Sequence, residues 1–166
     1  MLIESNTDQL KHECPSFAKP MLGEGIVNIR LTQIDGKFPN LALMKLSHYH
    51  KSQGHNVVFE KSIVKGMFEP EYNVVYGSAI FSTSAKKIKQ FKSNFPNAII
   101  GGTGTNETTT VEATLNLNEY EFYDYEIYPD FEGSIGFSQR GCRLRCKFCV
   151  VPKKEGKNVN SNTIYN

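Results

Sequence analysis

Between residues 26 and 101, short apolar segments rich in β-branched residues alternate with segments that carry apolar residues at helical spacing. The segment 26–34 alternates and is β-branched, whereas 73–80 is apolar along nearly its whole length. A continuous apolar run of this kind is typical of a strand buried on both faces, as in parallel sheets. Strands that alternate with helices at this spacing predict an α/β fold built on a doubly wound parallel sheet.

The apolar pattern and the turn residues set the bounds of the expected elements. Residues 105–132 are Thr-rich and then acidic and aromatic, and they predict a covering loop with a short helix. Residues 134–137 predict one more strand, which leads to a group of cysteines. The other expected strands are 26–34, 57–59, 73–80 and 98–100, and the expected helices are 41–53 and a second one from Ser82 or Ser84 to about Phe95.

These elements divide the chain into three regions. Residues 1–24 are polar, are broken by prolines and hold Cys14, so they predict a flexible or loosely docked leader. Residues 25–132 form the expected α/β domain. Residues 133–166 hold the last expected strand and the cysteine-rich loop.

Composition excludes several classes of protein. With 166 residues, 39% hydrophobic residues and a net charge of +2, the chain suits one globular domain, and nucleic-acid binding is not indicated. The sequence has no run of eighteen apolar residues and no signal peptide, so we expect a cytoplasmic protein without a membrane partner. Its four cysteines are a poor disulfide framework, because three of them lie within eight residues. Metal ligation is the better use for these three.

The three clustered cysteines are Cys142, Cys146 and Cys149. Three thiolates on one short loop can hold a [4Fe–4S] cluster and leave one iron open for another ligand. Basic residues around the loop would offset the negative charge of the thiolates and the cluster. Structural zinc sites usually take four ligands from paired motifs, and no second cysteine pair follows here.

The spacing Cys-x3-Cys-x2-Cys, with Phe148 just before the third cysteine, resembles the radical S-adenosylmethionine (SAM) superfamily. This resemblance implies that Cys142, Cys146 and Cys149 bind the cluster and that Phe148 borders the adenine of SAM. It also implies that the open iron binds SAM, which is cleaved reductively to a 5′-deoxyadenosyl radical. An electron donor such as flavodoxin or ferredoxin would be a partner, and residues 134–137 would be the first strand of the radical SAM barrel.

An α/β domain in front of this motif resembles the subfamily that carries a Rossmann-like, cobalamin-binding domain. Gly101 and Gly102 follow the expected fourth strand, at the edge where ligands of open α/β sheets bind. They predict a backbone edge that a cobalamin or a nucleotide could approach, although a turn that needs positive φ explains them equally well. Residues 35–38 lack the histidine that binds cobalt in part of the family, and residues 102–107 lack the third glycine of a dinucleotide motif.

Only 17 residues follow Cys149, whereas a radical SAM barrel needs many more. We therefore expect the N-terminal part of a radical SAM enzyme, with an incomplete barrel whose remainder is a separate chain or lost to truncation. Whether this chain is itself an enzyme stays open, as does its substrate. Two alternatives remain: a non-catalytic iron–sulfur or ligand-binding domain, and a zinc-binding interaction module.

Overall fold

A computed structural model of the chain describes residues 25–105, 109–118, 120–144, 146–149, 151–155 and 159–161. The expected leader, with Cys14, lies outside the described residues, as does most of the tail after residue 155. Among the described helices, none is long and apolar enough to cross a membrane.

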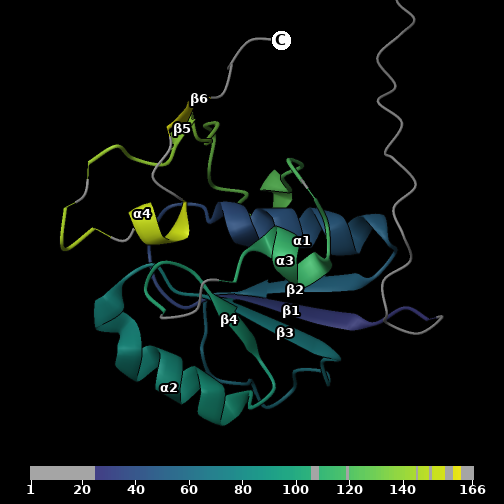
Figure 1. The fold of residues 1–166 in the computed structure, drawn as a ribbon. Coiled ribbons are helices and arrows are strands. Elements are labelled where there is room, and N and C mark those ends of the chain that lie inside the picture. Colours follow the sequence, from purple (N-terminus) through teal and green to yellow (C-terminus); the bar gives the residue numbers. More distant parts are fainter. Residues whose placement is uncertain are drawn as a thin grey trace, which may run out of the picture.

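A four-stranded parallel sheet organises the domain (Figure 1). Its strand order is β2-β1-β3-β4. After β1 the chain adds β2 on one side, and it then adds β3 and β4 on the other side, so the order of the strands switches between β1 and β3. This is the order of flavodoxin-like doubly wound sheets. Leu31 in β1 pairs with Phe59 in β2 and Tyr76 in β3, which makes β1 a central strand. The strands are β1 (Asn28–Gln33), β2 (Asn56–Glu60), β3 (Val74–Ser78) and β4 (Ile99–Gly101).

Helices cover both faces of this sheet, as Figure 1 shows with α1 (Leu41–Ser52) on one side and α2 (Ala85–Asn94) on the other. Ile29 and Leu31 of β1 pack with Leu43 and Leu46 of α1 in one core cluster. The second cluster lies on the opposite face and consists of Ile34, Ala79, Phe91, Phe95 and Ile100. The predicted doubly wound α/β sheet is thereby confirmed, and each predicted helix and strand between residues 26 and 101 is present within a few residues.

The connection between β2 and β3, residues 61–73, crosses the α2 face without forming a helix. Arg30 of β1, whose side chain is fully buried, holds this connection against the sheet. The guanidinium donates hydrogen bonds to Glu69 and, at 2.7 Å, to the carbonyl oxygen of Ser62. It also lies 4.8 Å from the centre of the Phe95 ring. The connection is therefore attached to the sheet by a buried cation, whereas most such connections are attached by the apolar face of an amphipathic helix.

The predicted covering segment 105–132 contains a short helix, α3 (Val111–Leu115), and one 3₁₀ turn, Tyr125–Ile127. Val111 and Leu115 pack on the same core cluster as α1, so α3 covers the α1 face of the sheet. The buried Tyr128 hydroxyl donates to Gln33 Oε1 of β1 at 2.8 Å. The covering prediction is confirmed for the described part of this segment.

The strand predicted at residues 134–137 is wrong, because this segment is irregular and pairs with no strand among the described residues. The Tyr125 hydroxyl bonds both the amide and the carbonyl of Ile135, at 3.2 Å each, so a side chain takes the place of a neighbouring strand. A two-stranded antiparallel ladder follows instead, from β5 (Gln139–Arg140) and β6 (Asn160–Ser161), and α4 (Val151–Lys154) lies between them.

Candidate functional site

A cleft opens at the carboxyl edge of the sheet, where β1 and β3 are neighbours and the chain switches direction. Its volume is about 500 Å³. Open α/β sheets bind ligands at this switch point, because the loops after the two strands diverge and leave a crevice. The walls come from the start of α1 (39–46), the ends of β3 and β4 (76–80 and 99–103), the start of α3 (109–114), and residues 135–137, Arg140 and Glu155.

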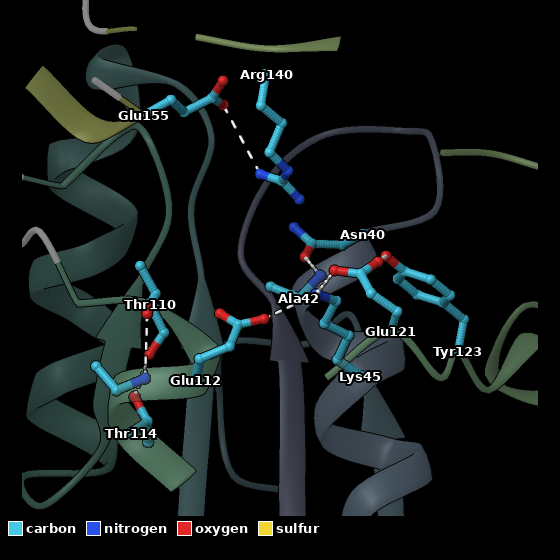
Figure 2. Close-up of polar contacts among 11 residues, drawn as sticks. Asn40, Ala42, Lys45, Thr110, Glu112, Thr114, Glu121, Tyr123, Arg140 and Glu155 are labelled. Atoms are coloured by element: carbon cyan, nitrogen blue, oxygen red, sulfur yellow. Dashed lines mark hydrogen bonds and ion pairs between the residues drawn. The ribbon is translucent and has the colours of Figure 1, made fainter. Parts of the chain in front are cut away.

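Asn40 shapes the floor of the cleft and is also the N-cap of α1. Its Oδ1 accepts hydrogen bonds from the amides of Ala42 and Leu43, at 3.1 and 3.2 Å (Figure 2). Its Nδ2 donates to Ser78 Oγ at the end of β3, at 2.8 Å. One side chain therefore fixes the start of the helix and ties it to the neighbouring strand, which holds both sides of the switch point in place.

Lys45 of α1 is a buried cation in the wall of the cleft. Its Nζ lies 2.8 Å from Glu112 of α3 and 2.7 Å from Glu121, and Figure 2 shows all three converging with Tyr123. Burial alone would raise the pKa of Glu112 and Glu121, but the hydrogen bonds and charge of Lys45 keep each pKa below its ordinary value. Burial, followed by the bond to Glu121, raises the pKa of the Tyr123 phenol. These ion pairs of Lys45 hold the covering segment over the cleft.

Arg140 and Glu155 stand at the rim of the cleft and bracket the cysteine loop. Their ion pair spans 3.9 Å, and Glu155 Oε2 also accepts a hydrogen bond from the amide of Gly141 at 3.0 Å. The Arg140 guanidinium lies 4.1 Å from the centre of the Phe137 ring, which itself lines the cleft. These contacts place the base of the cysteine loop beside the switch-point cleft.

The three predicted cluster ligands lie on this loop with their thiols free of disulfides. Cys146 is exposed, Cys142 and Cys149 are half-buried, and the amide of Cys149 donates to the carbonyl of Cys146 at 3.1 Å. Within the described residues, no three side chains of Cys, His, Asp or Glu are gathered as a metal site. Three uncommitted thiols on one surface loop are nevertheless the donor set that an iron–sulfur cluster requires, so the chemistry of these residues fits the group.

Phe148, the predicted neighbour of the adenine, is 93% exposed. Leu144, on the same loop, is 61% exposed. Neither residue therefore belongs to a core cluster of the described chain, and both side chains remain available to a ligand that binds against the loop.

Gly101 and Gly102, which the sequence analysis proposed as a ligand edge, both line the cleft. Gly102 has a φ of +105°, and a Cβ there would meet the carbonyl oxygen of Ala79 at 2.2 Å. Close approach of the loops after β3 and β4 therefore accounts for Gly102. Gly101 has no such constraint, because its nearest contact would be Thr109 at 3.7 Å.

Replacing Gly102 with alanine is expected to lower the free energy of unfolding by about 2 kcal/mol or more, from the positive φ and the contact with Ala79. Gly101→Ala, one residue away, is the matched control and should change stability by less than about 0.5 kcal/mol. Urea unfolding followed by circular dichroism measures both. Equal effects of the two substitutions would contradict the assignment of the constraint to Gly102.

The described residues that line the cleft include no histidine. Residues 35–38, where part of the family has the cobalt-binding histidine, contain none either. Asp35 has a different part in this structure, since its carboxylate accepts from the amides of Ile80 and Phe81 at 2.6 and 3.0 Å. It joins the loop after β1 to the loop after β3.

Sequence reasoning missed Asn40, Lys45 and Glu112 as residues of the site. Asn40 carried a usable signal, because an asparagine directly before a helical pattern is a typical N-cap. The sequence around Lys45 and Glu112 gives no such signal, because these residues are 67 positions apart and come into contact only in the folded chain.

Comparison of the chain with models of protein families, with curated proteins and with solved structures finds no match.

Proposed function

We propose that this chain provides the cluster-binding segment of a radical SAM enzyme, with Cys142, Cys146 and Cys149 as the ligands of a [4Fe–4S] cluster. The observation that carries the proposal is the spacing of these cysteines, with an aromatic residue, Phe148, directly before the third of them. Further support comes from the free thiols on one surface loop. When bound, the cluster would supply one electron for the reductive cleavage of SAM.

The proposal assigns roles to the three cysteines, to Phe148 and to Glu155. The cysteines would bind three irons of the cluster and leave the fourth open for SAM, and Phe148 would border the adenine of SAM. Glu155 holds the amide of Gly141 and pairs with Arg140, so it orients the start of the loop toward the cleft. The cleft, with a volume of about 500 Å³, is the space in which a small-molecule substrate or cofactor would lie beside the loop.

Anaerobic reconstitution with iron and sulfide tests the proposal. The protein should become brown and oxygen-sensitive and bind about four iron and four sulfide ions per chain. Cys146→Ala should lose the colour, because two thiolates do not hold the cluster. Cys14→Ala is the matched control and should keep it, since this cysteine lies outside the motif.

Two results would replace this proposal by its alternatives. A colourless protein that keeps about one zinc per chain would indicate a zinc-binding module. A brown protein whose reduced electron paramagnetic resonance spectrum does not change on addition of SAM would indicate a non-catalytic iron–sulfur domain. Urea unfolding of Cys146→Ala should match that of the parent chain, because the loop lies outside both core clusters.

A further inference from the structure

A second groove, of about 650 Å³, lies at the carboxyl edge of the sheet near the start of α2. It shares no lining residue with the switch-point cleft. The loop after β1, the end of β2 and the start of α2 form its walls. The lining residues are Gln33 to Phe38, Lys61, Phe81, Ser84 and Lys87.

The groove is positively charged. Three lysines line it, Lys37, Lys61 and Lys87, and none of them forms an ion pair with the described residues. One carboxylate, that of Asp35, lies among them and is engaged by the two backbone amides after β3. Three lysines against one aspartate leave an excess of two positive charges, which favours an anionic ligand.

The N-terminus of α2 adds to this preference. Ser84 lines the groove and is 8% exposed, yet its hydroxyl makes no capping bond and has no hydrogen-bond partner in the described chain. The first turn of this ten-residue helix contains no acidic residue but carries Lys86 and Lys87. The positive charges of these lysines lie at the positive end of the helix dipole and are repelled by it, and a bound anion would relieve this repulsion. A phosphate group would satisfy the dipole, the lysine and the serine together.

Two aromatic side chains flank the charged part of the groove. Phe38 is 74% exposed and Phe81 is 54% exposed, and neither ring stacks on another ring of the described residues. Exposed rings beside a phosphate-binding helix end provide a platform for a planar group. Bases of nucleotides stack on such rings in many complexes.

From this geometry we infer that the groove binds a phosphate monoester that carries a planar ring, as in a mononucleotide. The phosphate lies at Ser84 and Lys87, at the start of α2, and the ring stacks on Phe38 or Phe81. This site is separate from the cysteine loop and does not depend on the function proposed above.

Isothermal titration calorimetry of the full chain tests this site, with AMP, adenosine, ribose 5-phosphate and inorganic phosphate as probes. AMP should bind more tightly than each of the other three, because only AMP has both the phosphate and the ring. Ser84→Ala and Lys87→Gln should each weaken AMP binding about tenfold or more, which corresponds to the loss of one hydrogen bond to a charged group. Lys92→Gln removes the same charge from the other end of α2 and should change the affinity less than about twofold.

Several outcomes would overturn the inference. They are the absence of AMP binding at millimolar concentration, binding of inorganic phosphate or adenosine as tight as that of AMP, and equal weakening by Lys87→Gln and Lys92→Gln. Ser84→Ala removes no hydrogen bond from the described fold, so the variant remains folded and a loss of binding reports on the groove. Circular dichroism of each variant checks this point.

Discussion

Replacing Arg30 with alanine is expected to lower the free energy of unfolding by about 3–5 kcal/mol, the cost of breaking a buried ion pair from one side. Arg30 is fully buried and bonds Glu69, Ser62 and Thr32. Burial alone would raise the pKa of Glu69, but the hydrogen bond and charge of Arg30 keep that pKa below its ordinary value. Without Arg30, the carboxylate stays partly buried with no cation beside it, and the connection between β2 and β3 loses its anchor.

Urea unfolding followed by circular dichroism measures the Arg30 effect, and Lys65→Ala is the control. Lys65 forms an ion pair of 2.6 Å with Glu71 in the same connection, but the Glu71 side chain is 92% exposed. Exposed pairs contribute less than about 1 kcal/mol, so this variant should be close to the parent chain. The double variant Arg30→Met with Glu69→Gln should recover part of the loss, because it leaves no buried charge unpaired. A loss for Arg30→Ala no larger than that for Lys65→Ala would contradict the anchoring role.

The stability of the domain is expected to fall by about 3 kcal/mol between pH 7 and pH 4 because of His50 alone. This side chain is 1% exposed at the end of α1, with Nε2 3.2 Å from the Tyr76 hydroxyl and with Nδ1 unpaired among the described residues. Burial, and then the nearby charge of His55, lower the pKa of His50 from 6.5 to about 4. The unfolded chain takes up a proton near pH 6.5 while the folded chain resists protonation until about pH 4. The stabilisation is therefore fully present above about pH 6.5 and is lost as the pH falls through this window.

His50→Gln isolates the histidine from the carboxylates that also titrate in acid. The variant keeps a polar group within reach of Tyr76 but has no proton to bind in this window. We expect its free energy of unfolding to depend less steeply on pH between 7 and 4 than that of the parent chain. Parallel pH profiles for the two proteins, measured by urea unfolding at each pH, would show that His50 does not cause the acid sensitivity.

Much of the fold could be predicted because local patterns and the sheet agree with one another. The apolar run at 73–80 became the buried strand β3, and the amphipathic period of 41–53 became α1. The strand predicted at 134–137 failed for a different reason. Alternation of apolar residues identifies a segment that is able to pair as a strand. In residues 134–137, however, the Tyr125 hydroxyl occupies the amide and the carbonyl of Ile135, which a neighbouring strand would otherwise bond.

The candidate site was less predictable than the fold. The spacing of Cys142, Cys146 and Cys149 is local and could be recognised from the sequence, and the two glycines at the end of β4 could be placed at the carboxyl edge. Lys45 and Glu112 could not be paired, because nothing in the local sequence of α1 or α3 indicates the other. The groove beside α2 was also hidden, since its three lysines come from three separate segments.

By itself the sequence determined the α/β class, the doubly wound parallel sheet and the three candidate cluster ligands, because these follow from local periodicity and local spacing. Only the tertiary structure decided the strand order β2-β1-β3-β4, the cleft at its switch point and the position of the cysteine loop at the rim of that cleft. It also decided which charges are buried, since Arg30, Lys45 and His50 acquire their partners from segments that are far apart in the chain. Burial and long-range contact depend on how the elements pack, and no local pattern encodes them.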